Sequence, residues 1–495
     1  MQRRLPISLG LLAIVAAACG GASPGVTAVG SQRDGGGLIP TESTQPGDTI
    51  PVEPTYEVVD GVVDFGEAGP THPEYDGFLI AAFSDIQQFW TEAFPETYGA
   101  PWEPLTGGIY AAYPGRQAPI PGCGEDVSNY DDVQGNAFYC IDGDFMAYDD
   151  GELLPGLVGL LGKEAVAVAI AHEFGHAIQA RAGEWQNPTI LKEQQADCFA
   201  GAWSAHAASG GSDTIHFDDA DVRAGMIAML YVRDPIEGEG LADPNAHGTG
   251  FDRVGAFQDG FIGGPVRCQP FFTENRLDGL VDIPFDYEDP NAGNLPLVDP
   301  APDPTDGPED IVTLIPLSLE LFWVALAAAN AVTFTPPTLS PFPNAGPFPS
   351  CAGIDEAAYP DNVVFCPGDN TIYWDQDTML ELSLNANTGD MSVGYLFSNA
   401  YSEAVQTALQ SSRVGEARAL FDDCLTGAWV AYIVPPIPDD GRESFLQLSA
   451  GDLDEAITTA MGRSDVSSDT DIVGSAFEKI DAFRTGVLGG LNSCV

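Results

Sequence analysis

The pattern of apolar and polar positions predicts strands followed by helices in the first half of the chain. Two segments between residues 107 and 150, GGIYAAYPG and NAFYCIDGDFMAYDD, have the short apolar runs of β-strands. The Asp142-Gly143-Asp144 step in the second segment is expected to form a hairpin turn. Longer apolar segments then predict helices over about 163–182, 190–209, 220–233 and 248–262. These elements predict an α+β fold with a small sheet followed by helices.

The second half of the chain repeats the first. Residues 251–268, FDRVGAFQDGFIGGPVRC, are similar to residues 477–494, FEKIDAFRTGVLGGLNSC, at an offset of about 226 residues. A repeat of this length indicates a duplicated domain, because solenoid repeats are much shorter. We expect two tandem copies, residues 57–285 and 311–495, joined by a Pro- and Asp-rich linker at 286–310.

The N-terminal pattern predicts export. Arg3 and Arg4 precede an apolar stretch that ends at Ala18, so residues 1–18 are interpreted as a signal peptide. The small residues before Cys19 resemble the lipobox of bacterial lipoproteins, which would make Cys19 the lipidated first residue; ordinary cleavage in an Ala-rich site is the alternative. Residues 19–56 are rich in Gly, Ser, Thr and Pro and are expected to be a flexible tether. We therefore expect a protein of the cell envelope or the extracellular space, held at the outer face of a membrane by its lipid.

Charge and hydropathy exclude some classes of protein. Asp and Glu number 73 against 18 Lys and Arg, giving a formal net charge of −55. Such a chain repels phosphate backbones, so no nucleic-acid partner is expected. With 44% hydrophobic residues it can form large cores, and no apolar run is expected to be long enough to span a membrane.

The nine cysteines follow the duplication, because four fall in each copy and Cys19 is left over. In an exported protein, even numbers at repeated spacings predict disulfides. The expected pairs are Cys123–Cys140, Cys198–Cys268, Cys351–Cys366 and Cys424–Cys494. A thiolate metal site is the competing interpretation, which is disfavoured because the second copy keeps all four cysteines and has no histidine.

The candidate chemistry lies in the first copy, which holds all six histidines. His172 and His176 flank Glu173 in an HExxH motif within an apolar helical segment, so both imidazoles share one helix face. This spacing suits a zinc ion, with Glu173 as the base that takes a proton from a water molecule. A helix with two hydrogen-bonded core histidines is the alternative.

A second acidic motif strengthens the metal interpretation. Glu193 follows His176 by seventeen residues, opens the next predicted helix and could supply the third ligand. Asp197 lies one turn further on and could accept the free ring N–H of a ligand histidine.

HEFGHAIQ, the segment from Glu193 through ADCFAGAW and the NAFYC segment resemble the neutral zinc metallopeptidase family of bacteria, and more broadly the gluzincins. The resemblance runs through nearly all of the first copy. It implies a zincin-like fold and one Zn²⁺ per chain, held by His172, His176 and Glu193, with Glu173 as general base and Asp197 orienting a histidine.

His247 and Arg253 resemble the segment that, in related membrane-bound zinc endopeptidases, directs a histidine at the tetrahedral intermediate. Both are therefore candidate catalytic residues, since a donor placed where negative charge develops stabilises the transition state. A loop histidine packed against an acidic surface is the alternative for His247.

The second copy has lost this motif. Asn399, Ala400, Glu403 and Ala419 stand opposite His172, Glu173, His176 and Glu193, and of the proposed site Asp423 alone is retained. The second copy is interpreted as a degenerate peptidase domain that extends the substrate groove, holds a partner or supports the first copy.

Two functions remain open from the sequence. The first is an exported, lipid-anchored zinc endopeptidase acting on a peptide or protein substrate. The second is a non-catalytic envelope lipoprotein, a binding or scaffold module with a vestigial or structural metal site. A structural zinc site normally has four protein ligands, and three at motif spacing with a base beside them favour catalysis.

Overall fold

The computed structural model describes residue 56 and residues 61–494, apart from residues 125–128, 186–187, 237, 239, 241–242, 244–245, 284, 286–292, 305–306, 330–331, 386, 436–445 and 464–473. The expected signal peptide (1–18), Cys19 and all of the expected tether except Tyr56 lie outside the described residues. The chain divides into two compact units. Unit 1 comprises the residues up to Asp234 together with Leu241–Leu280, and unit 2 comprises Pro235–Gly240 and the residues from Val281 onward.

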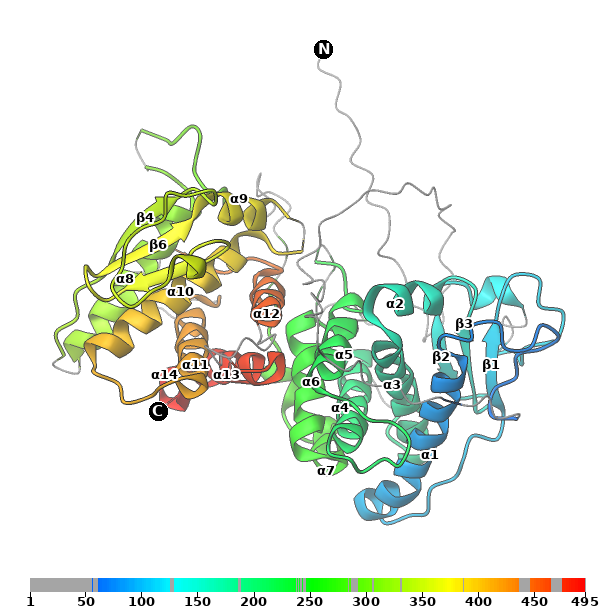
Figure 1. Cartoon of the computed structure of the whole chain (residues 1–495). Coiled ribbons are helices and arrows are strands. Elements are labelled where there is room, and N and C mark those ends of the chain that lie inside the picture. Colours follow the sequence, from blue (N-terminus) through cyan, green and yellow to red (C-terminus); the bar gives the residue numbers. More distant parts are fainter. Residues whose placement is uncertain are drawn as a thin grey trace. The chain divides into compact units, whose positions relative to one another are not determined.

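Each unit contains a small three-stranded sheet (Figure 1). In unit 1 the central strand β3 (Phe145–Asp149) is parallel to β1 (Gly108–Ala112) and antiparallel to β2 (Ala137–Cys140). The expected hairpin at Asp142-Gly143-Asp144 is confirmed, since it joins β2 to β3. In unit 2 the central strand β6 (Thr371–Asp375) has the same relation to β4 (Thr338–Phe342) and β5 (Val363–Cys366).

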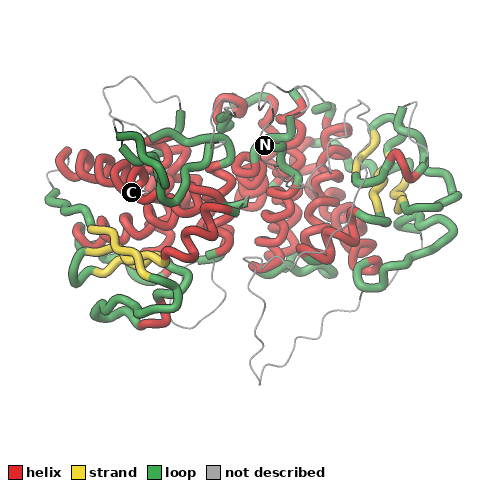
Figure 2. The backbone as a smooth tube through the Cα atoms, turned by 90° about the horizontal axis from the view of Figure 1, so that it is seen from above, coloured by secondary structure: helices red, strands yellow, loops and turns green. Residues whose placement is uncertain are grey.

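Helices make up most of both units (Figure 2), which confirms the predicted α+β class. The helices of unit 1 are α1 (Asp76–Tyr98), α2 (Leu153–Leu161), α3 (Lys163–Ala182), α4 (Thr189–Ala208), α5 (Asp219–Tyr231), α6 (Gly250–Gly263) and α7 (Pro265–Cys268). Four of them, α3 to α6, lie where the sequence pattern predicts helices. The long helix α1 precedes the sheet and was not predicted.

Unit 2 repeats this order of elements. Its helices are α8 (Ile311–Ala329), α9 (Gln376–Leu384), α10 (Gly389–Ala408), α11 (Glu416–Ile433), α12 (Asp452–Gly462), α13 (Ala476–Gly489) and α14 (Leu491–Cys494). Part of the expected linker packs within this unit, because Leu297 is buried and the backbone N–H of Ile311 donates to Pro296 O.

Helix α8 corrects one expectation. Among the described helices it alone is long and apolar enough, by length and composition, to cross a membrane, with a mean hydropathy of 2.1. Its Ile315 and Leu319 are buried in unit 2, and Pro316 lies inside it. A helix that packs in a protein core can meet the same criterion of length and hydropathy. The expectation that no apolar run reaches this length was wrong. Residues 311–329 contain a single charged residue, Glu320, which leaves the mean hydropathy of the segment high.

All four expected disulfides are present: Cys123–Cys140, Cys198–Cys268, Cys351–Cys366 and Cys424–Cys494. In each unit the longer-range disulfide joins the short last α-helix to the helix that carries Glu193 or, in unit 2, its equivalent Ala419. Cys198 and Cys424 lie in α4 and α11, while Cys268 and Cys494 end α7 and α14.

Candidate metal centre

Helix α3 carries the HExxH motif through the centre of unit 1. Every residue from Ala165 to Gln179 except Ala169 is buried, because α1, α2, α4, α5 and β2 all pack against this helix. A helix surrounded in this way needs apolar or small residues on all faces, which explains its run of alanines and valines. The polar motif side chains are therefore held in an interior position.

The third donor comes from α4, which approaches α3 closely at a glycine. A Cβ atom on Gly175 would lie 2.7 Å from Ala196 Cα, so the glycine inside the motif permits this approach. As a result, Glu193 Oε2 lies 3.2 Å from His172 Nε2 and 3.6 Å from His176 Nε2.

This donor set fits a zinc ion. The three atoms all lie within 4.8 Å of one another on buried side chains, so the group could hold a metal ion. Two donors bound to a tetrahedral zinc at about 2.0–2.2 Å lie about 3.4 Å apart, which the observed 3.2 and 3.6 Å bracket. A tetrahedral ion held by these three donors would keep one position for water or substrate.

Asp197 orients His172, as the sequence predicts. His172 Nδ1 lies 2.7 Å from Asp197 Oδ1, so the carboxylate holds the ring with Nε2 facing Glu193. Arg253 lies behind this pair and is completely buried. Its Nε and one terminal nitrogen donate to the two oxygens of Asp197 at 2.9 and 2.8 Å, and its other terminal nitrogen donates to Val232 O.

The structure therefore places Arg253 against Asp197, where it fixes the carboxylate that contacts His172. The catalytic role that the sequence suggests for Arg253 stays a prediction.

Glu173 lies on α3 between the two histidines without joining the ligand group. Its Oε2 accepts a hydrogen bond of 3.2 Å from the backbone N–H of Tyr139, on β2. Because β2 is an edge strand, this N–H points away from β3, so the outer edge of the sheet lies beside Glu173.

His247 is held near the same group by Asp234, which the sequence did not predict. Asp234 Oδ1 lies 3.2 Å from His247 Nδ1, while its Oδ2 accepts the backbone N–H groups of His247 and Gly248. Gly248 has a φ of +110°, which other residues rarely adopt, so glycine is needed at this turn.

Negative charge dominates the site without a metal. Burial alone would lower the pKa of His172, but the Asp197 carboxylate raises it to about 10. Burial would likewise raise the pKa of Glu193, yet His176 and His172 hold it well below its usual value. Burial raises the pKa of Glu173, against the effect of the two histidines. The field that draws protons to the histidines also favours a bound cation, which would compete with those protons.

The counterpart in unit 2 keeps the supporting ion pair and replaces the ligands. Lys479 Nζ donates to Asp423 Oδ2 at 2.7 Å, in the same relation as Arg253 to Asp197, and Asn399 Nδ2 donates to Asp423 Oδ1 at 2.9 Å. The sequence interpretation recognised Asp423 but missed Lys479, whose signal is the same offset of 226 residues.

At the positions of His176 and Lys192, unit 2 has Glu403 and Arg418, joined by two hydrogen bonds of 2.7 Å. A separate group of buried carboxylates, Asp390, Asp452 and Glu455, also gathers its oxygens within 4.8 Å. It contains no histidine and lies outside the positions equivalent to HExxH.

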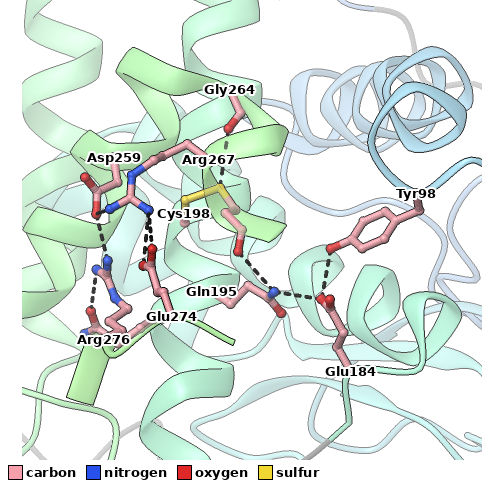
Figure 3. The surroundings of a disulfide bond; sticks show 11 residues. Tyr98, Glu184, Gln195, Cys198, Asp259, Gly264, Arg267, Glu274 and Arg276 are labelled. Carbon is pink, nitrogen blue, oxygen red and sulfur yellow. Dashed lines mark hydrogen bonds and ion pairs between the residues drawn. A yellow bond between two sulfur atoms is a disulfide. The ribbon is translucent and has the colours of Figure 1, made fainter. Parts of the chain in front are cut away.

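A polar network braces α4 around its disulfide (Figure 3). Gln195 Nε2 donates to Glu184 Oε2 at 2.7 Å and to Cys268 O at 3.2 Å, and Tyr98 OH donates to the same oxygen of Glu184 at 2.9 Å. These bonds connect the ends of α1 and α3 to α4 and α7, and thereby fix the helix that carries Glu193 and Asp197.

Comparison with known proteins gives relatives of no stated function. The chain is 31% identical over 172 residues to the uncharacterized protein YpfJ of Escherichia coli (strain K12), and equally to YpfJ of Escherichia coli O6:H1. The match covers 30% of this chain, and the chain spans 57% of the length of these relatives. No protein-family model and no solved structure matches the chain.

Proposed function

We propose that unit 1 is an exported, lipid-anchored zinc endopeptidase domain of the gluzincin type, which hydrolyses peptide bonds with Glu173 as general base. The observation that carries this proposal is the buried His172–His176–Glu193 group at zinc spacing, with an additional carboxylate on the same helix outside the ligand set. A structural zinc site normally has four protein ligands, whereas this group offers three with a carboxylate beside them.

The residues around the group support hydrolysis of a peptide. A bound zinc ion would polarise the substrate carbonyl and make water easier to deprotonate. Glu173 would take the proton of the attacking water and pass it to the leaving amine. His247, anchored through Nδ1 by Asp234, would donate to the carbonyl oxygen as negative charge develops on it.

The edge of β2 supports an extended peptide as the substrate. Its outer edge lies beside Glu173, and a peptide strand added there would gain backbone hydrogen bonds without a requirement for a particular side chain, with the Tyr139 N–H released from Glu173. Export to the envelope or the extracellular space agrees with four disulfides, which persist in oxidising compartments. In this proposal unit 2 is the degenerate peptidase copy.

The test separates the base from the ligands. Glu173→Gln should lower the rate of hydrolysis of a peptide library by about 10²–10⁴-fold, while elemental analysis still finds one zinc ion per chain. Glu193→Ala, the control, should lose both zinc and activity. A Glu173→Gln variant that hydrolyses peptides at the wild-type rate would contradict the mechanism. A zinc-loaded wild type that cleaves no peptide would favour the binding-lipoprotein function instead.

A further inference from the structure

Gln179 is a completely buried side chain that contacts both helices of the candidate metal centre. It follows His176 by one turn of α3. Its Nε2 donates to the backbone carbonyl of Lys192 at 2.6 Å, and its Oε1 lies 3.0 Å from His176 Nδ1. Lys192 immediately precedes Glu193, so the amide lies between one ligand and the residue next to another.

These two contacts determine the orientation of the amide. A carbonyl oxygen can only accept, so the NH₂ end of Gln179 must face Lys192 O. The amide oxygen then faces His176 Nδ1 and requires a proton there. A neutral imidazole with its proton on Nδ1 presents the lone pair of Nε2, and His176 Nε2 is the atom that lies 3.6 Å from Glu193 Oε2.

In the second copy, the bond from the glutamine amide to the backbone is present, and the bond to a histidine is not. Gln406 occupies the equivalent place on α10, is also completely buried, and donates to the carbonyl of Arg418 at 3.0 Å. With Glu403 in the place of His176, its Oε1 accepts from Ser411 Oγ at 3.0 Å. The bond from the amide to the backbone is therefore common to both units, whereas the bond to a histidine exists in unit 1 only.

We infer that Gln179 is a positioning residue for the metal centre, which fixes the Nδ1–H tautomer and the ring orientation of His176 so that Nε2 faces the metal. The inference rests on the proposed function for the identity of the metal. Asp197 has the same relation to His172, so each ligand histidine has its own buried acceptor.

The first measurement is zinc affinity by chelator competition, with matched variants in the two units. Gln179→Leu removes both contacts and should weaken zinc binding about 10–100-fold, the range for loss of a hydrogen-bond partner of a ligand histidine. Gln406→Leu removes the equivalent backbone bond in unit 2, together with the bonds to Asp422 and Ser411, and should leave zinc affinity unchanged. Equal affinity in Gln179→Leu and the wild type would overturn the inference while the proposed function stands.

Gln179→Glu separates a role through the histidine from a role through the backbone. It keeps an acceptor for His176 but loses the donor to Lys192 O, so its affinity should remain within a few-fold of the wild type. Affinity that falls in Gln179→Glu as far as in Gln179→Leu would assign the effect to the backbone bond and overturn the inference. If Gln179→Leu does not fold, Gln179→Glu is compared with the wild type alone, and a loss of zinc affinity of about 10–100-fold in Gln179→Glu would overturn the inference.

A spectroscopic measurement tests the tautomer directly. In the zinc-loaded wild type and in Gln406→Leu, the buried His176 Nδ1–H should give a slowly exchanging downfield proton resonance, which should be absent from Gln179→Leu. The resonance persisting in Gln179→Leu would overturn the inference. A wild type that takes up no zinc would overturn both this inference and the proposed function, and it would be recognised before any variant is compared.

Discussion

At the scale of residues, both units keep a buried ion pair at the same position, although the metal-ligand residues are present only in unit 1. Arg253–Asp197 supports His172 in unit 1, and Lys479–Asp423 occupies the same place in unit 2, where Asn399 has replaced the histidine. An aspartate that is completely buried needs a cation beside it whether or not a metal ligand remains, because an unpaired buried charge is costly.

This comparison predicts separate effects on stability and on zinc. Arg253→Met leaves Asp197 buried without its cation and should destabilise unit 1 by about 3–5 kcal/mol, with weaker zinc binding. Arg253→Lys should cost less, since unit 2 tolerates lysine at this position. Urea unfolding and chelator competition measure the two effects. Lys479→Met, the control, should destabilise unit 2 and leave zinc affinity unchanged; a loss of zinc affinity in that variant would contradict the assignment.

At the same scale, sequence predicted the donors better than their supports. The His172–His176 pair and the Glu193–Asp197 pair follow from i, i+4 spacing, because one turn of helix places such side chains on one face. The contacts of Asp234 and Gln179 could not be predicted from helical spacing. The contact of Asp234 with His247 depends on a turn, and the role of Gln179 depends on a carbonyl supplied by another helix.

At the scale of elements, two glycines in each unit allow a pair of helices to come into close backbone contact. A Cβ on Gly201 of α4 would lie 1.9 Å from Phe257 O of α6, and one on Gly260 would lie 1.7 Å from Cys198 O. The same arrangement joins α11 to α13 through Gly427 and Gly486. In unit 1 this contact holds α6, and therefore Arg253, against the helix that carries Asp197.

Gly201→Ala should therefore affect both packing and the metal centre. The added methyl group forces α4 and α6 apart, which should cost about 1–3 kcal/mol and weaken zinc binding by displacing Arg253 from Asp197. Gly427→Ala meets Phe483 O at 2.0 Å and should cost about the same in unit 2, with no change in zinc affinity. Thermal unfolding and zinc titration of both variants measure this. Unchanged zinc affinity in Gly201→Ala would show that the site tolerates movement of α6.

The sequence pattern predicted α3 to α6 because apolar segments of this length are typical of helices and too long for most strands. It did not predict α1, α2 or α8. Pro155 and Gly156 lie within α2, and Pro95 and Pro316 lie inside α1 and α8, so local preference argues against helix in each. Burial of Trp90 and Phe83 in α1, and of Leu319 in α8, shows that packing stabilises them instead.

At the scale of the whole molecule, two units with separate cores and two disulfides each share one chain of net charge −55. The proposed zinc site, His172, His176 and Glu193, lies in unit 1. A ligand that binds only the folded form stabilises the part of the chain it binds, and by an amount set by its concentration and affinity.

Removal of zinc should therefore destabilise unit 1 and leave unit 2 unchanged. At a free zinc concentration about 1,000 times the dissociation constant, binding adds about 4 kcal/mol to the stability of unit 1. Calorimetry of the full chain should show two transitions, of which a chelator lowers one. In His172→Ala the same chelator should shift neither transition, because the site no longer holds the ion. A shift of both transitions in the wild type would mean that unit 2 also binds the metal or depends on unit 1 for its stability, and a shift of neither would mean that unit 1 holds no metal.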